Sequence, residues 1–230
     1  MPRPLVIAHR GASAGAPGNS LEAFDRAIAA GADLLEFDVR RTAAGELVVF
    51  HDLLADGARV GRLTRAQIGE RMGRTPPLLT EVLDLAEGRV GVDVELKEGG
   101  YVDEVLAAIG DRFAPEELMV TSFSSWVVRD LKRRAPQVHA GLVLGLSNVG
   151  WVAPAGRARR CGADTVLVRR SFAERHTLAE VHDAGLAPLV WTVNDEEGLR
   201  RHLSDSRVRG VITDVPEIAV PLREELAQAV

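Results

Sequence analysis

Residues 91–134 read GVDVELKEGG YVDEVLAAIG DRFAPEELMV TSFSSWVVRD LKRR. The short apolar runs at 91–96 and 118–122 have the length of buried strands. Each run is followed by a segment with apolar residues at helical spacing, 102–109 and 125–134. Strands that alternate with helices in this way are typical of α/β proteins with a parallel sheet. This stretch therefore predicts two consecutive strand–helix units.

The same alternation continues towards both ends of the chain. The pattern predicts further strands at 5–8, 33–39, 140–144, 165–168, 188–192 and 210–213, and further helices at 20–30, 79–86, 174–184, 195–203 and 215–227. Eight strands in 230 residues give about 29 residues per unit, which suits a (β/α)8 TIM barrel. A doubly wound open sheet is the alternative.

The chain is expected to form one barrel domain over residues 1–230. A further extended piece at 47–50 follows the second strand closely. Residues 53–77 are polar and rich in Gly and Pro, and they predict a short insertion with one helix near 64–70. Residues 153–161 are only weakly patterned, and no helix is predicted there.

Composition excludes several classes of protein. The chain has 28 Lys and Arg against 33 Asp and Glu, so a general affinity for nucleic acid or for anionic membranes is not expected. A single cysteine, Cys161, rules out a disulfide framework and a Cys-rich zinc site. No apolar run approaches the roughly 20 residues of a membrane span, and the N-terminal run 4–8 is too short for a signal peptide. A cytoplasmic protein without stable membrane insertion is expected.

Polar residues gather at the carboxyl ends of the predicted strands, which share one face of a barrel. Glu36 and Asp38 lie two residues apart on one strand and so point to the same side, and Glu95 is near the end of the next. Three carboxylates in a barrel mouth need a cation or protons, and oxygen ligands suit Mg²⁺ or Ca²⁺ better than zinc. The alternative is surface carboxylates, or structural pairs with Arg40 or Arg41.

Two histidines follow extended runs that lead to the same face. His9 and His51 are suited to act as acid and base because the pKa of imidazole is near working pH. Either histidine alone is more often a structural residue, but together with three acids they favour a catalytic site. The other four histidines lie near strand starts or on predicted helices, where a structural role is expected; they are His139, His176, His182 and His202.

Cations and aromatic residues occupy neighbouring positions. Arg10 and Lys97 follow His9 and the Glu95 strand, so they are candidates for holding a phosphate, with charge balance as the alternative. Trp191 and Phe123 end strands and are candidates for an apolar wall against the substrate, or for core residues. Asp214 is a candidate for orienting a histidine or for capping the last helix.

Together these residues resemble the glycerophosphodiester phosphodiesterases. The matching motifs, in the family's order, are Ala8-His9-Arg10-Gly11-Ala12, Asn19-Ser20-Leu21-Glu22-Ala23-Phe24, Glu36-Phe37-Asp38-Val39 with Thr42, His51-Asp52, Val94-Glu95-Leu96-Lys97, Ser122-Phe123, Trp191-Thr192-Val193-Asn194 and Gly210-Val211-Ile212-Thr213-Asp214-Val215-Pro216. Each motif is weak alone, but the ordered set is highly specific.

The resemblance implies a barrel enzyme that uses a divalent cation, Mg²⁺ or Ca²⁺, to hydrolyse glycerophosphodiesters to sn-glycerol 3-phosphate and an alcohol. Carried over by motif, it implies metal ligation by Glu36, Asp38 and Glu95, acid/base catalysis by His9 and His51, phosphate contacts by Arg10 and Lys97, and a glycerol wall that includes Trp191. Either water or the substrate's own glycerol hydroxyl is the nucleophile.

Two departures from the family pattern affect this expectation. The family usually has Pro-Glu-Asn before the first helix, and here Gly18 replaces the glutamate. The insertion at 53–77 is short, which suggests an open pocket that admits lysophospholipids. The alternatives are therefore a lysophospholipase D-type activity or a non-catalytic phosphoester-binding barrel. A Schiff-base lyase that uses Lys97, a barrel phospholipase D and a phosphatidylinositol-type phospholipase C are further rivals.

Overall fold

The computed structural model describes residues 3–145, 154–173 and 177–228. Eight parallel strands pair side by side and close on themselves through the pairing of the first with the second. In order around the barrel they are β1 (Leu5–His9), β2 (Leu34–Arg41), β6 (Gly91–Leu96), β7 (Leu118–Ser122), β8 (His139–Leu144), β9 (Thr165–Arg169), β10 (Ala187–Trp191) and β11 (Gly210–Thr213). The predicted (β/α)8 TIM barrel is confirmed, and an open sheet is excluded.

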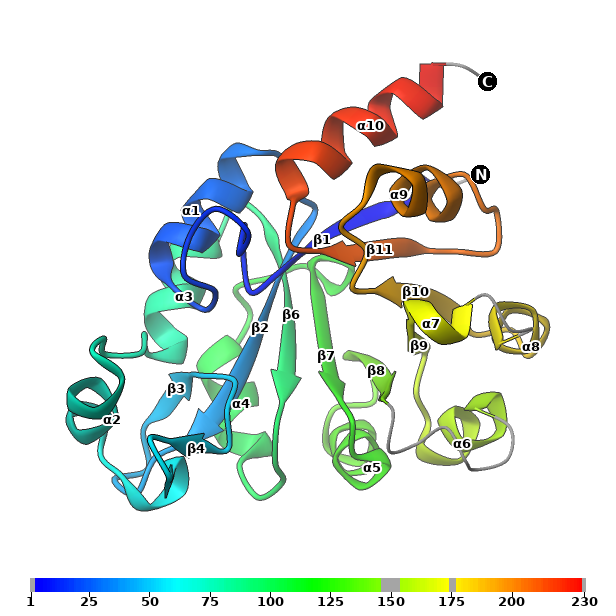
Figure 1. Cartoon of the computed structure of the whole chain (residues 1–230). Coiled ribbons are helices and arrows are strands. Elements are labelled where there is room, and N and C mark those ends of the chain that lie inside the picture. The colour runs from blue at the N-terminus through cyan, green and yellow to red at the C-terminus, as the bar shows by residue number, and fades with distance from the viewer. Residues whose placement is uncertain (1–2, 146–153, 174–176, 229–230) are drawn as a thin grey trace.

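Helices cover the outside of the strands (Figure 1). They are α1 (Leu21–Ala29), α3 (Leu79–Ala86), α4 (Val102–Ile109), α5 (Ser125–Arg134), α6 (Pro154–Cys161), α7 (Arg170–Phe172), α8 (Leu178–Asp183), α9 (Glu196–Leu203) and α10 (Pro216–Gln228). Apolar residues of the strands and of the facing helix sides form the main core between the two layers. Across the described ranges, no helix combines the length and apolarity that crossing a membrane requires.

Two helix predictions need correction. Residues 154–161 form α6, whose buried side consists of Ala155, Ala158 and Cys161. Three arginines among its eight residues weaken the apolar pattern, so no helix was predicted here. The helix predicted from residue 174 begins at Leu178 as α8, preceded by the short α7, and residues 174–176 lie outside the described part of the chain.

The insertion after the second strand lies beside the carboxyl end of β2 (Figure 1). The predicted extended piece is β3 (Leu47–Val49), which pairs antiparallel with β2. The insertion follows it and contains β4 (Leu54–Ala55), β5 (Ala58–Arg59), η1 (Val60–Arg62) and α2 (Arg65–Met72). A small apolar core of its own is formed by Val48, Phe50, Ala55, Val60, Leu63 and Ile68. The helix predicted near 64–70 corresponds to α2.

The barrel interior changes from apolar to polar along the strands. Successive residues of a strand face opposite sides, so inward positions recur every second residue. An inward apolar cluster consists of Ile7, Leu34, Met119, Val143, Leu167, Leu189 and Ile212. Two residues further along these strands, the inward positions hold His9, Glu36, Thr121, Arg169, Trp191 and Asp214. Of this layer, His9, Glu36, Thr121 and Trp191 line the pocket of the candidate site.

Candidate active site

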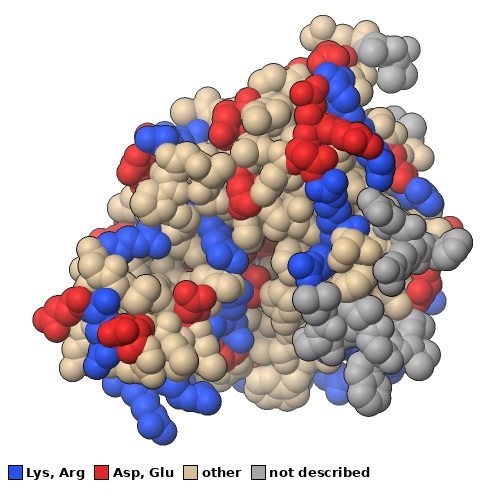
Figure 2. Space-filling view, viewed as in Figure 1, with Lys and Arg blue, Asp and Glu red and all other residues tan. Residues whose placement is uncertain are grey.

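A pocket opens at the carboxyl ends of the barrel strands. It is lined by His9, Arg10, Glu36, His51, Glu95, Lys97, Thr121, Phe123, Val143, Leu167, Trp191 and Ile212. All predicted site residues line it except Asp38, which is fully buried beside it. In the view of Figure 2, acidic side chains lie between basic ones near the middle of the face.

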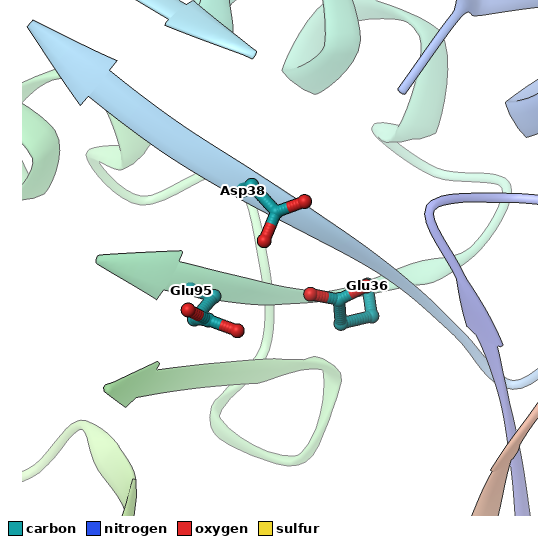
Figure 3. Close-up of side chains that lie close together, drawn as sticks. All are labelled: Glu36, Asp38 and Glu95. Atoms are coloured by element: carbon teal, nitrogen blue, oxygen red, sulfur yellow. The ribbon is translucent and has the colours of Figure 1, made fainter. Parts of the chain in front are cut away.

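Glu36, Asp38 and Glu95 form a compact carboxylate cluster. β2 and β6 are adjacent, and Asp38 and Glu95 are direct neighbours in their register. Each residue offers one oxygen, and these oxygens lie within 4.8 Å of one another (Figure 3). Burial, together with repulsion from Asp38 and Glu95, raises the pKa of Glu36 well above its ordinary value. Three buried oxygen donors this close fit a hard divalent cation such as Mg²⁺ or Ca²⁺.

Two cations contact the cluster directly. The Lys97 Nζ lies 2.6 Å from Asp38 Oδ1 and 2.5 Å from Glu95 Oε1, and Arg10 Nε lies 3.1 Å from Asp38 Oδ2. Burial opposes ionisation of Asp38, but Lys97 and Arg10 outweigh it and lower the pKa of this carboxyl. Charge balance is therefore one role of both cations. Arg40 pairs instead with Glu98, so the alternative pairing with the cluster is not found among the described residues.

The environment of Lys97 disfavours the Schiff-base lyase. Burial opposes the charged ammonium, but Glu95 and Asp38 reverse that effect and raise the pKa of Lys97. A Schiff-base lysine needs a lowered pKa, because only the neutral amine is a nucleophile. Lys97 is therefore an ammonium that neutralises carboxylates.

Asn19 is a site residue that belongs to one of the family motifs but was not among the predicted site residues. Ser20 caps α1 by accepting from the Ala23 amide, and Asn19 instead turns inward with φ 57°. Its Nδ2 donates to Asp38 Oδ2 over 2.7 Å, and the side chain is buried. Asn19 thus holds the orientation of Asp38.

A second missed residue, Asp93, lies deeper in the barrel. It is fully buried on β6, two residues before Glu95 and opposite Glu36 in register. Thr121 donates to Asp93 Oδ1 over 2.9 Å, and burial raises the pKa of this carboxyl well above its ordinary value. Burial therefore favours the neutral form of Asp93 over the charged one. Asp93 lies two residues before Glu95, so its side chain faces the same side of β6, and this spacing could have identified it as a site residue.

His9 is anchored by Asp214. Its Nδ1 lies 2.6 Å from Asp214 Oδ1, and the Ser13 hydroxyl lies 2.8 Å from the same oxygen. Asn194 Nδ2 donates to Asp214 Oδ2 over 2.6 Å, while Asn194 Oδ1 accepts from the Asp214 amide. Burial alone would raise the pKa of Asp214, but the bond with His9 and these neighbours lower it to about 2. Because an ionised carboxylate only accepts, His9 carries its proton on Nδ1 and directs Nε2 elsewhere.

His51 is held differently. Its Nδ1 lies 2.7 Å from Asp52 Oδ1, and both side chains are exposed, at 41% and 63%. Arg40 donates through Nε and Nη2 to the His51 carbonyl, which fixes the backbone of this loop. Burial lowers the pKa of the His51 imidazole. The two predicted catalytic histidines therefore share one pocket but differ in how firmly they are held.

Part of the pocket wall is aromatic. The rings of Phe123 and Trp191 meet edge to face with centroids 5.6 Å apart. Trp191 Nε1 donates to the Leu167 carbonyl over 3.1 Å, and the Lys97 ammonium lies 5.6 Å from the centre of the Phe123 ring. Both predicted wall residues line the pocket and are partly buried.

Two glycines of the loop before α1 have different roles. A Cβ on Gly11, at φ 82°, would lie 2.5 Å from the Ala23 carbonyl carbon, so this glycine allows the loop to pack on α1. Gly18, which replaces the family glutamate, lies against the Arg10 side chain. Its carbonyl accepts from Arg74 Nη2 over 2.8 Å, so the insertion contacts the site loop here.

Comparison with known proteins agrees with this geometry. Residues 9–218 match the model of the glycerophosphoryl diester phosphodiesterase family. The chain is 32% identical to a glycerophosphodiester phosphodiesterase of Caldanaerobacter subterraneus, over 95% of this chain and 97% of the relative. A glycerophosphodiester phosphodiesterase of Thermotoga maritima aligns at 28% identity with a TM-score of 0.82, covering 96% of this chain and 99% of that one.

A second solved structure gives the same result. A glycerophosphoryl diester phosphodiesterase of Silicibacter pomeroyi, named putative, aligns with a TM-score of 0.84 at 26% identity, covering 98% of this chain and 95% of that one. The family match extends over most of the barrel and includes both histidines and all three clustered carboxylates. The chain therefore belongs to the glycerophosphoryl diester phosphodiesterase family.

Proposed function

We propose that this protein hydrolyses glycerophosphodiesters to sn-glycerol 3-phosphate and an alcohol in a reaction that depends on a divalent cation. The observation that carries the proposal is the convergence of three carboxylates, two histidines and two cations on one pocket of a barrel from this family. A phosphodiester anion repels nucleophiles, so its hydrolysis requires positive charge at the phosphate and proton transfer at the reacting oxygens.

The carboxylate cluster is the proposed metal site. Glu36, Asp38 and Glu95 would hold one Mg²⁺ or Ca²⁺, and the ion would supply Lewis-acid stabilisation of charge at the phosphoryl oxygens. Arg10 and Lys97 already lie beside these carboxylates, so both are placed to contact the same phosphate.

Proton transfer is assigned to His9 and His51. One imidazole accepts the proton of the attacking hydroxyl as its oxygen bonds to phosphorus, and the other donates a proton to the alcohol oxygen as that bond breaks. With Nδ1 of each ring held by an aspartate, Nε2 is the atom that exchanges protons. Trp191 and Phe123 would pack on the carbon skeleton of the substrate.

The test is release of sn-glycerol 3-phosphate from glycerophosphocholine and glycerophosphoethanolamine with Mg²⁺, with Ca²⁺ and with EDTA. We expect turnover that EDTA abolishes and metal restores. His9→Ala and His51→Ala should each lower kcat by at least about 10²-fold. A cyclic phosphate product would identify the glycerol hydroxyl as nucleophile. Absence of turnover with either metal would refute the proposal and favour a phosphoester-binding role.

Metal binding has a test that needs no turnover. Calorimetric titration with Mg²⁺ and Ca²⁺ should show one site whose affinity falls in Glu36→Gln and Glu95→Gln. Glu104→Gln is the matched control, because Glu104 pairs with Arg41 on the exposed surface outside the cluster. Equal affinity in all three variants would place the metal elsewhere.

A lysophospholipid substrate is the second candidate. The side chains of Leu53 and Leu54 at the start of the β4 hairpin are 44% and 45% exposed, and they directly follow the His51-Asp52 motif. An acyl chain leaving the pocket on this side would cover them. Turnover of lysophosphatidylcholine faster than that of glycerophosphocholine would support this candidate. We also propose that the chain forms a single barrel domain and acts in the cytoplasm.

A further inference from the structure

Arg169 lies in the mouth of the barrel, although neither the motifs nor the roles assigned above include it. It is the last residue of β9, two positions after Leu167, which lines the pocket. Side chains two residues apart on a strand face the same side, so Arg169 faces the barrel axis one layer above Leu167. In the register of β9 and β10 it lies directly beside Trp191, and it is half-buried.

No acidic group neutralises this guanidinium in the part of the chain that the structure describes. The other cations of the mouth are engaged: Arg10 and Lys97 contact the carboxylate cluster. The next residue along the chain, Arg170, forms an ion pair with Asp195. No ion pair or side-chain hydrogen bond joins Arg169 to any described residue. A half-buried charge that no described residue neutralises is unfavourable, so this position gains from an anionic ligand.

The position of β9 in the barrel indicates which part of a ligand Arg169 can reach. The strand order places β9 four strands from β2, on the opposite side of the barrel from Glu36 and Asp38. Phe123, which follows β7, and Trp191, which ends β10, also line the pocket, and their rings meet edge to face. A substrate whose phosphodiester sits at the carboxylate cluster would therefore present a remote group to Arg169.

We propose that Arg169 binds a second anionic group of the substrate, remote from the scissile phosphodiester. The inference rests on the proposed function and refines its substrate class to glycerophosphodiesters whose alcohol portion carries a carboxylate or phosphate. Arginine suits this role because its planar guanidinium binds either group through two parallel hydrogen bonds.

Glycerophosphoserine and glycerophosphoethanolamine test the proposal, because the two differ only by a carboxylate. We expect Arg169→Gln to lower kcat/KM for glycerophosphoserine by about 10- to 100-fold, the range for loss of a charged hydrogen bond. The value for glycerophosphoethanolamine should change less than about threefold. Arg169→Lys should restore part of the loss, because it keeps the charge. Arg170→Gln is the matched control and should not alter the ratio between the substrates.

Two results would overturn the inference. Either Arg169→Gln slows both substrates equally, or it leaves both unchanged. Calorimetric binding of glycerophosphoserine and glycerophosphoethanolamine to the wild-type protein and to Arg169→Gln separates this test from that of the proposed function. Without turnover of any substrate the proposed function fails, while a selective loss of glycerophosphoserine binding in Arg169→Gln would still support the anion contact. An equal affinity of wild type and variant would refute it.

Discussion

Asp214→Asn is the substitution that tests the anchoring of His9 most sharply. The Asp214 carboxylate accepts from His9 Nδ1 and Ser13 on one side and from Asn194 Nδ2 on the other. Asparagine at 214 offers one acceptor and one donor in nearly the same volume. If its amide nitrogen faces His9, the imidazole must move its proton from Nδ1 to Nε2. If its oxygen faces His9, two amide nitrogens meet at Asn194.

Either arrangement carries a calculable penalty. An unsatisfied buried donor costs about 1–3 kcal/mol, and in a serine protease triad the equivalent change of tautomer lowers kcat by about 10⁴-fold. We therefore expect Asp214→Asn to lower kcat by about 10²- to 10⁴-fold with a small change in KM. Only the arrangement with the amide nitrogen facing His9 keeps an acceptor for Asn194 Nδ2, so nitrogen-15 NMR of the imidazoles should show His9 with its proton moved to Nε2.

Asp52→Asn is the matched control, because it changes the equivalent bond of the other histidine. Asp52 is 63% exposed, and exposed pairs contribute little, so we expect less than about a tenfold loss of kcat. The reasoning would be refuted if Asp214→Asn kept kcat within about threefold of wild type. It would also fail if the variant lost activity while His9 kept its proton on Nδ1.

Four further predictions concern stability and ligand affinity. Asn19→Ala should weaken Mg²⁺ binding by about 10- to 100-fold in calorimetry, whereas Ser20→Ala should only remove a helix cap, lowering the free energy of unfolding by about 1 kcal/mol. Gly11→Ala should lower the free energy of unfolding in urea by about 1–3 kcal/mol, because its Cβ would overlap the α1 backbone. The pKa of Asp214 is about 2 in the folded protein and about 3.9 in the unfolded chain, so ionised Asp214 stabilises the fold above pH 4, and this stabilisation is lost as pH falls towards 2. Because Asp214 is partly exposed to solvent, we expect a contribution of about 1–2 kcal/mol. The difference in unfolding free energy between wild type and Asp214→Asn during acid titration measures it. Gly18→Glu should raise KM for glycerophosphodiesters in steady-state assays.

The barrel was predictable because two periods recur along the whole chain. Apolar runs of strand length alternate with helical spacing, and six predicted elements agree with the structure to the residue, those at 79–86, 91–96, 102–109, 118–122, 125–134 and 210–213. The pattern failed at α6, where arginines occupy most of the helix surface and only small side chains face the core. Burial of alanine and cysteine leaves little periodic signal.

The site was predictable where a motif fixes both the residue and its strand position. His9, Glu36 and Lys97 fall on strand ends, and the barrel brings all strand ends to one face. Asn19 and Arg169 were missed for a different reason. Their roles depend on what surrounds them: a left-handed backbone that turns Asn19 inward, and for Arg169 a register that brings it beside the aromatic wall. Neither property is encoded locally.

Gly18 changes the charge of the site in a direction that favours an anionic substrate. Ionised Glu36, Asp38 and Glu95 carry three negative charges, while Arg10, Lys97 and a divalent ion would carry four positive ones. The loaded site would therefore keep one positive charge, which a phosphodiester monoanion neutralises. A glutamate at position 18, beside the Arg10 side chain, would cancel that charge before the substrate binds and would repel the phosphate. Arg74 of the insertion donates to the Gly18 carbonyl and so places a further positive charge beside this loop.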